Sequence, residues 1–242
     1  MASASSDIVP ELSATEVVFE DLLTKIVSGL YSDRLPAERD LARQLGASRA
    51  TVRSALNRLE SWRLVCPKRG SGVVVRDQRE WSIEALPAYL RHGGGGDVAG
   101  VASMLGDLLE IRRTLIITVL GLVAGRTDGR TLERPRQLLR GAWEARHQGT
   151  SFAEQDYEMM RAVVAAAGIL PALWMLNDIG GIYLAIARTW AGGLPPLDDY
   201  VEVHERLFEK LEAGERQGAQ DLIRDYLGRH DERLMKVLEA FT

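Results

Sequence analysis

The stretch that decides the fold spans residues 36–75 and reads PAERDLARQLGASRATVRSALNRLESWRLVCPKRGSGVVV. Pro36 suits the first turn of a helix and Gly46 suits its end, and between them lies an apolar face made of Leu41, Ala42 and Leu45. A second helix is expected after Ser48, a good N-cap, because apolar side chains recur at helical spacing at Val52, Ala55, Leu56 and Leu59. Two β-prone runs, 64–66 and 73–75, flank a basic, Gly-containing tip at 67–72. The pattern predicts a winged helix-turn-helix.

The other face of the second helix carries cationic side chains. Arg49 and Arg53 lie one turn apart, and nothing acidic interrupts them before Glu60. A guanidinium group binds guanine at two atoms or clamps a phosphate, and small neighbouring residues let the helix approach the major groove closely. Residues 34–76 contain ten Lys/Arg and three Asp/Glu, a local charge of +7 in a chain whose formal net charge is -4. This local excess favours binding to DNA.

Simpler interpretations of the same residues exist. An arginine-rich helix face is more often a solvated surface than a reader of nucleic acid, and a helix-turn-helix can serve only for packing or dimerisation. Here the basic helix, the basic tip and the absence of acids on the helix face coincide, which favours DNA. Arg39 is flanked by Glu38 and Asp40, so it can equally pair within its own helix.

The same residues carry a family resemblance. The pattern P-A-E-R-x-L-A-x-x-L-G-x-S-R-x-T-V-R-x-A-L-x-x-L, followed by a G-x-G tip, resembles the DNA-binding domain of GntR-type bacterial transcription regulators. The sequence departs from the family at Trp62-Arg63, where a glycine usually precedes the first wing strand. The resemblance implies two sets of DNA contacts. Those to the major groove or to phosphates are Arg39, Ser48, Arg49 and Arg53, and those to the minor groove are Arg69 and Gly70.

Length and composition define the rest of the chain. The 242 residues leave room for a second domain, and the hydrophobic share of 46% with 26% charged residues is ordinary for a globular protein. Cys66 is the only cysteine, which favours a reducing compartment, and the N-terminus has no signal-peptide pattern, so a cytoplasmic protein without a membrane partner is expected. We expect a disordered arm at 1–14, the winged domain at 15–77, a linker helix and glycine loop at 78–97, and a helical domain at 98–242.

The C-terminal part is predicted to be an antiparallel all-α bundle, which makes the fold mainly α with a small β wing. The glycines at 93–96 lack the Lys-Ser/Thr pair of a phosphate loop and are expected to form only a loop. The apolar run 115–124 is short of the ~20 residues of a membrane span, so a buried core helix is expected at 104–124. Further helices are expected at 134–146, 152–167, 170–190, 197–213 and 217–241, without strands.

Residues 107–241 resemble the effector domain of the FadR-like subgroup of GntR regulators, a bundle that binds small metabolites. The resemblance rests on three segments, Glu110-Ile111-Arg112, FAEQDY at 152–157, and VHE at 203–205 followed by LEAG at 211–214. Many members of the subgroup hold a divalent metal with an aspartate and three histidines. The matching positions here are Asp156, Met160, His204 and Tyr226. A thioether and a phenol are poor ligands for such an ion, so no metal and no other cofactor is expected; the acyl-CoA-responsive branch has likewise lost this site.

Each candidate in this half also has a structural interpretation. A buried Arg112 needs an anion, which is either an internal acid or a ligand carboxylate or phosphate. His204 is either a buried histidine with one hydrogen bond or part of a ligand site. Asp156 can simply accept a hydrogen bond from Tyr226 or His204. The methionines 159, 160 and 175 suit an ordinary core as well as an acyl-binding cavity.

Together these residues indicate a metabolite-responsive transcription regulator that binds a palindromic DNA operator as a homodimer, with Arg112, Asp156, Met160, His204 and Tyr226 at the effector site. A fatty acyl-CoA or a similar amphipathic anion is the expected effector. The alternatives are a metal-dependent sensor of a small organic acid and a DNA-binding architectural protein without an effector. An enzyme is not expected, because Asp156 and His204 have neither a nucleophile nor an intact metal site beside them.

Overall fold

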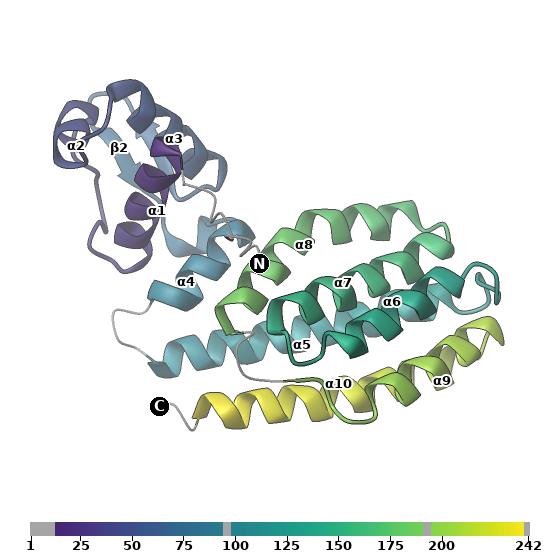
Figure 1. The fold of residues 1–242 in the computed structure, drawn as a ribbon. Coiled ribbons are helices and arrows are strands. Elements are labelled where there is room, and N and C mark those ends of the chain that lie inside the picture. The colour runs from purple at the N-terminus through teal and green to yellow at the C-terminus, as the bar shows by residue number, and fades with distance from the viewer. Residues whose placement is uncertain (1–12, 94–97, 191–194, 240–242) are drawn as a thin grey trace, which may run out of the picture. The chain divides into compact units, whose positions relative to one another are not determined.

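The computed structural model describes residues 13–93, 98–190 and 195–239, and the chain divides into two compact units between residues 97 and 98 (Figure 1). Each unit has its own apolar core. Within the described residues the chain is helical apart from one two-stranded antiparallel sheet, so the predicted mainly α fold is confirmed.

The N-terminal unit begins with helix α1, Ala14–Val27. The Ser13 side chain accepts a hydrogen bond from the Glu16 N–H at 3.2 Å and caps the helix. Residues 13 and 14, which the sequence analysis assigned to a disordered arm, therefore belong to this helix, and residues 1–12 lie outside the described part of the chain. The helix buries its apolar stripe, including Phe19 and Leu22, in the core of the unit.

The predicted helix-turn-helix consists of α2, Glu38–Gln44, and α3, Arg49–Ser61. The first helix starts two residues later than Pro36, with Ala37 at its N-cap, and the chain turns at Gly46, whose φ of 60° is free of strain only for glycine. Ser48 caps α3 as predicted, because its side chain accepts the Thr51 N–H at 3.0 Å. The apolar face of α3 is buried as expected, at Val52, Ala55, Leu56 and Leu59.

The wing consists of β1, Val65–Lys68, and β2, Gly72–Val75, paired antiparallel with Val65 opposite Val75. The first strand runs two residues further than the sequence analysis expected. A third segment was not foreseen: the Leu35 N–H donates to the Val73 carbonyl at 3.0 Å, and the Val75 N–H donates to the Asp33 carbonyl at 2.8 Å. These bonds attach the segment that leads into α2 to the edge of the wing.

The departure from the family pattern before the wing has a backbone consequence. Arg63 adopts a left-handed conformation with φ of 60°, in the segment where the family usually has glycine. A side chain in this conformation costs about 1–2 kcal/mol relative to the right-handed one. The Leu64 N–H donates to the Leu59 carbonyl at 3.0 Å across this turn, so the end of α3 and the start of the wing stay joined.

The segment after the wing contains two 3-10 turns, η1 at Gln78–Glu80 and η2 at Ile83–Ala85, and then helix α4 at Leu86–His92. This differs from the single linker helix that we expected within residues 78–97. Ala85 and Ala88 are buried in the N-terminal core. The expected linker segment therefore contributes to the packing of this unit.

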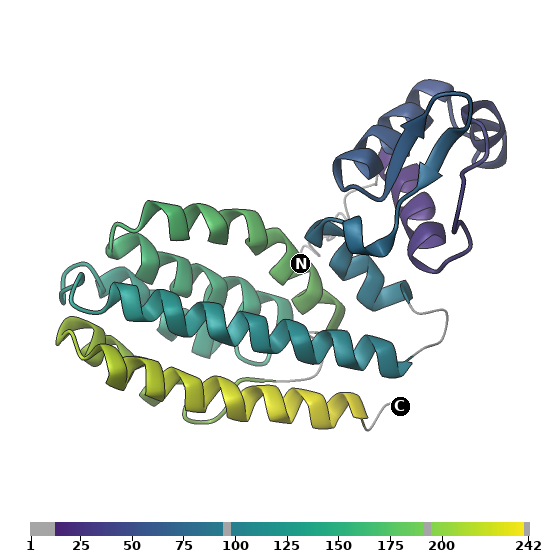
Figure 2. The same ribbon diagram turned by 180° about the vertical axis from the view of Figure 1, so that it is seen from behind.

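The C-terminal unit is a bundle of helices (Figures 1 and 2). They are α5 (Val98–Val123), α6 (Glu133–Glu144), α7 (Gly149–Ala166), α8 (Leu170–Trp190), α9 (Tyr200–Glu212) and α10 (Arg216–Glu239). The predicted bounds of α8 are confirmed, and no strand is found among the described residues of this unit.

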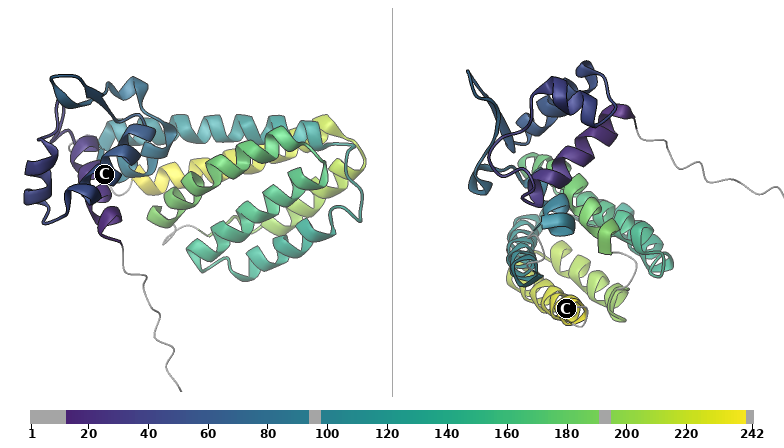
Figure 3. Two further views of the ribbon diagram at one scale, coloured as in Figure 1. Left: turned by 90° about the horizontal axis from the view of Figure 1, so that it is seen from above. Right: turned by 90° about the vertical axis from the view of Figure 1, so that its left-hand side faces the viewer.

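Helices that follow one another in the sequence of this bundle run in opposite directions (Figure 1). Helix α5 lies along α10, α6 packs on α7 and α9, and α8 packs on α7 (Figure 3). The core between these helices is built around Leu120, Leu139, Tyr200 and Phe208.

Two helices of this unit expose apolar side chains. On α5, Leu120 and Val123 are buried, whereas Ile111 is 58% exposed and Leu115 is 39% exposed. The expected core helix is therefore buried along one side only, because α5 buries the stripe that faces its neighbours. On α8, Trp174 is 63% exposed, and the segment from Leu170 to Arg188 is long and apolar enough to cross a membrane by length and composition, although that test alone is weak.

Candidate functional site

The candidate DNA-binding face lies on α3, where Arg49 and Arg53 are both exposed. Their guanidinium groups differ in what they contact. Arg53 binds the carboxylate of Glu38, the first residue of α2, through two of its nitrogens: the Nη2–Oε2 distance is 2.8 Å and the Nε–Oε1 distance is 3.4 Å. Among the described residues Arg49 has no hydrogen-bonded acid, so its guanidinium remains available to a partner.

The Glu38–Arg53 contact joins the two helices of the helix-turn-helix. The hydrogen bond from Arg53 lowers the pKa of the Glu38 carboxyl, and the nearby charges of Arg53 and Arg49 act in the same direction against burial. Glu38 therefore stays ionised and orients Arg53. The sequence analysis treated Glu38 only as a neighbour of Arg39, since a contact between residues 15 positions apart is invisible in helical spacing.

Two other predicted DNA-binding residues also lie on the surface of this unit. Arg39 is exposed, and its Nε lies 3.7 Å from Asp40, so the alternative of pairing within its own helix is realised in the free protein. Ser48 uses its hydroxyl oxygen to cap α3. A DNA phosphate that binds Arg39 would therefore have to replace the carboxylate of Asp40. A phosphate that binds Arg49 would displace no acidic side chain of the described residues.

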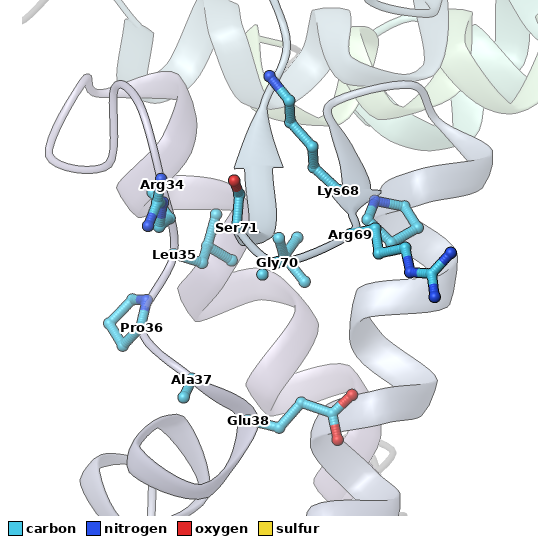
Figure 4. A pocket seen from close by; sticks show the side chains of 12 residues that line it. Arg34, Leu35, Pro36, Ala37, Glu38, Lys68, Arg69, Gly70 and Ser71 are labelled. Atoms are coloured by element: carbon cyan, nitrogen blue, oxygen red, sulfur yellow. The ribbon is translucent and has the colours of Figure 1, made fainter.

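The tip of the wing borders a groove of about 920 Å³ (Figure 4). One wall is the segment from Arg34 to Glu38, and the other runs from Pro67 to Val73. Gly70 turns the tip with φ of 77°, and Arg69 beside it is exposed. The groove and α3 are connected through Glu38, which lines the groove and binds Arg53.

The candidate residues of the C-terminal unit form a compact group around Asp156, which we call the Asp156 cluster: Asp156, Tyr183, Tyr200, His204 and Tyr226. The Tyr200 hydroxyl donates to Asp156 at 2.7 Å, and His204 Nδ1 lies 2.7 Å from the Tyr200 carbonyl oxygen. The ring of His204 lies 4.4 Å from that of Tyr200 and 5.2 Å from that of Tyr226, centroid to centroid. Three of the predicted effector residues are therefore brought together.

The donor to Asp156 is one that the sequence analysis missed. We expected a hydrogen bond from Tyr226 or His204, and Tyr200 makes it instead. Tyr200 lies one turn before His204 on α9, so helical spacing from His204 would have found it. Met160, another predicted effector residue, is partly buried and packs against the core.

Burial governs ionisation in the Asp156 cluster. It lowers the pKa of His204, although the charge of Asp156 opposes this shift, and it raises the pKa of Tyr200 and Tyr226, with the charge of Asp156 adding to both increases. The phenols and the imidazole are therefore neutral at neutral pH. The charge of Arg112 also reaches Tyr183, where it opposes the increase in pKa that burial and Asp156 cause.

Arg112 on α5 forms an ion pair with an acid inside the bundle. Its Nη2 donates to Asp231 on α10, a side chain that is only 5% exposed, and Arg113 donates to the other oxygen of the same carboxylate at 3.3 Å. The Nε of Arg112 is buried and has no hydrogen-bond partner among the described residues. Of the two anions considered for Arg112, the internal one is therefore present, and one donor is left open.

The residues at the positions of the metal ligands do not fit an ion. Asp156 and His204 are both hydrogen-bonded to Tyr200, and the other two positions carry the thioether of Met160 and the neutral phenol of Tyr226. In the part of the chain that the structure describes, no three His, Cys, Asp or Glu side chains are grouped closely enough to hold a metal.

Both units of the chain match known protein families. Residues 14–75 match "Bacterial regulatory proteins, gntR family", and residues 107–229 match "FCD domain". The HTH-type transcriptional regulator Mce2R of Mycobacterium tuberculosis is 30% identical over 222 residues, covering 89% of this chain and 90% of that protein. The Fatty acid metabolism regulator protein of Cronobacter sakazakii is 30% identical over 172 residues, covering 67% and 68%.

A solved structure of Lar, described as controlling the expression of the Listeria monocytogenes agr system, aligns with a TM-score of 0.54 at 15% identity, covering 94% of this chain and 97% of that chain. At this identity the likeness concerns the fold alone. It extends over both units of the chain.

Proposed function

The chain belongs to the gntR family of bacterial regulatory proteins and carries an FCD domain, and from this premise we propose that it binds a palindromic operator as a homodimer under the control of a small-molecule effector. It is a transcriptional regulator and not an enzyme. The observation that carries the proposal is the exposed face of α3, which presents a free Arg49 beside an Arg53 held in place by Glu38.

In this proposal α3 enters the major groove. Arg49 contacts a base edge or a phosphate there, Arg53 contacts DNA in the orientation that Glu38 sets, and Ser48 and Arg39 contact the flanking backbone. Arg69 and Gly70 at the wing tip reach the adjacent minor groove, since an arginine beside a glycine combines a long donor with a narrow backbone. A cytoplasmic location follows from binding chromosomal DNA in a bacterium.

We propose that the C-terminal unit provides the dimer contact. The exposed apolar side chains of α8, Leu170, Trp174 and Met175, form a surface of the kind that marks protein interfaces. A second copy is the partner that fits, because two copies are needed to read two half-sites. Replacing Trp174 with Glu should shift sedimentation from dimer to monomer, whereas a dimer that persists would exclude this face of α8.

The effector is proposed to bind at the Asp156 cluster, with a fatty acyl-CoA or a similar amphipathic anion as the ligand. The name of the 30% identical Cronobacter relative supports this class, as do the buried, neutral aromatic side chains of the cluster and the partly buried Met160. Arg112 would bind the anionic part by exchanging Asp231 for the ligand and by using its open Nε. Its replacement by Ala should abolish effector-dependent release of DNA and leave DNA binding intact.

Two alternatives make different predictions. A metal-dependent sensor of a small organic acid would contain a stoichiometric divalent ion, and a chelator would lower its melting temperature. A DNA-binding architectural protein would show no effector response. The side chains of Met160 and Tyr226 are poor metal ligands, which favours the acyl-CoA proposal over the metal-dependent sensor. The Nε of Arg112 has no hydrogen-bond partner among the described residues, which favours the proposal over an architectural protein without an effector.

The test is a selection of genomic DNA fragments by the purified full-length protein, followed by binding assays with each candidate effector. We expect enrichment of a palindrome whose half-sites lie about one helical turn, ~34 Å, apart. Acyl-CoA esters should weaken binding, and organic acids with divalent metals should not. Failure to enrich any DNA sequence, or binding to a single half-site as a monomer, would contradict the proposal.

A further inference from the structure

The groove beside the wing has a composition that the proposed contacts of α3 and the wing tip do not explain. It is lined by Arg34 and Pro36 on one side and by Lys68 and Ser71 on the other, and Figure 4 shows the two segments that carry these residues. Its volume of about 920 Å³ is open to solvent along the surface of the unit.

Both walls of the groove are held by one set of backbone hydrogen bonds. Leu35 donates to Val73 at 3.0 Å, and Arg34 pairs with Val74 as an additional bridge at the edge of the sheet. The side chain of Leu35 is buried at 3% exposure, so the alternation of side chains along an extended segment directs Arg34 outwards. The spacing between Arg34 and the wing is therefore fixed before any ligand binds.

The charges around the groove are positive and available. Arg34, Lys68 and Arg69 are exposed, and among the described residues none of them has an acidic partner. In the described part of the chain, Glu38 is the one carboxylate that lines the groove, and its charge is compensated by Arg53 at 2.8 Å. The groove thus presents cations to an anionic ligand without an exposed acid that would repel it.

We propose that this groove binds the sugar-phosphate strand that separates the major groove occupied by α3 from the minor groove occupied by the wing tip, with Arg34 and Lys68 as phosphate contacts. The inference rests on the proposed DNA-binding function. Adjacent major and minor grooves are divided by one phosphate strand, so a protein that enters both must pass over that strand. The groove adjoins both parts, because its lining includes the wing tip and also Glu38, which binds Arg53 of α3.

The experiment measures the affinity of full-length protein and of Arg34→Gln and Lys68→Gln variants for the operator and for random DNA over a range of KCl concentrations. Each lost phosphate contact should reduce the slope of log K against log salt by about 0.9 per half-site, and affinity should fall by the same factor on both DNAs. Arg140→Gln is the matched control, because it removes an exposed arginine from the C-terminal unit and should leave the slope unchanged.

Three outcomes would overturn the inference. Unchanged slopes in both variants mean that no phosphate lies in the groove, and a loss confined to the operator means that the side chains read bases. A slope that falls equally in Arg140→Gln means that only the total charge matters. The Arg49→Ala variant separates these results from failure of the proposed function: if it also binds DNA normally, the helix-turn-helix itself is not the reader. Melting temperatures of all variants verify that they are folded.

Discussion

The charged side chains of the two candidate sites differ in whether they already have a partner within the protein. On α3 and along the groove, cations such as Arg49, Arg34 and Lys68 are exposed and lack acidic partners among the described residues. In the C-terminal unit, Arg112 is bound to Asp231 and Asp156 is bound to Tyr200. A ligand of the first site gains its contacts directly, whereas a ligand of the second must replace contacts that already exist. Substitutions should therefore affect binding in the first unit and stability in the second.

The largest expected effect is in the Asp156 cluster. Tyr200 is 1% exposed and contacts Trp143, Phe152, His204 and Asp156, so Tyr200→Ala should lower the free energy of unfolding by about 3–5 kcal/mol through the cavity it leaves. Tyr200→Phe keeps the ring and removes only the hydroxyl, and should cost about 1–3 kcal/mol because Asp156 loses a donor. Urea denaturation measures both. Equal effects of the two variants would mean that packing contributes nothing.

Arg49→Ala should give the reverse pattern. Affinity for the operator should fall by about 1–3 kcal/mol if the arginine reads a base, with relaxed preference at one position in each half-site. The free energy of unfolding should change by less than about 0.5 kcal/mol, since the side chain is exposed. Fluorescence anisotropy on operator and random DNA makes the measurement. An equal loss on both DNAs would reassign Arg49 to a phosphate.

Protonation of His204 should destabilise only the C-terminal unit. Because burial lowers the pKa of His204 below its ordinary value of 6.5, the unfolded chain binds the proton more readily than the folded one. The stability contributed by the neutral form is complete above pH 6.5 and falls below it, by up to about 1.4 kcal/mol per pH unit until the folded pKa is reached. Denaturation between pH 7.5 and 5.5 should show this slope in the wild type and in His147→Gln, an exposed control, but not in His204→Leu.

The smallest expected effect on DNA binding is that of replacing Glu38, which forms an ion pair with Arg53 on the DNA-binding face. Glu38→Gln should release Arg53, which then gains about one phosphate contact, so the slope of log K against log salt on random DNA should steepen by about 0.9 per bound subunit. Preference for the operator over random DNA should decrease at the same time, because Arg53 loses its fixed orientation. An unchanged preference would mean that α3 alone positions this arginine.

Sequence reasoning predicted the elements whose signals are local. The bounds of α8, the cap at Ser48 and the buried face of α3 follow from spacing and composition, and all three were confirmed. Contacts between distant positions were not predicted. Asp231 lies 119 residues from Arg112, and the Leu35–Val73 bond joins segments that carry no common pattern. The left-handed Arg63 was also missed, because an arginine gives no indication of a conformation that glycine prefers.

The attachment of residues 33–35 to β2 has a mechanical consequence. The backbone hydrogen bonds between residues 33–35 and β2 connect the wing to the segment that leads into α2. The wing and the helix-turn-helix are therefore held at a fixed distance from each other and do not move independently. With this distance fixed, the wing tip cannot shift to follow a duplex whose minor groove is wide. The duplex must supply the adjustment, and sequences that narrow or bend easily beneath the wing tip will be preferred there without any contact to their bases.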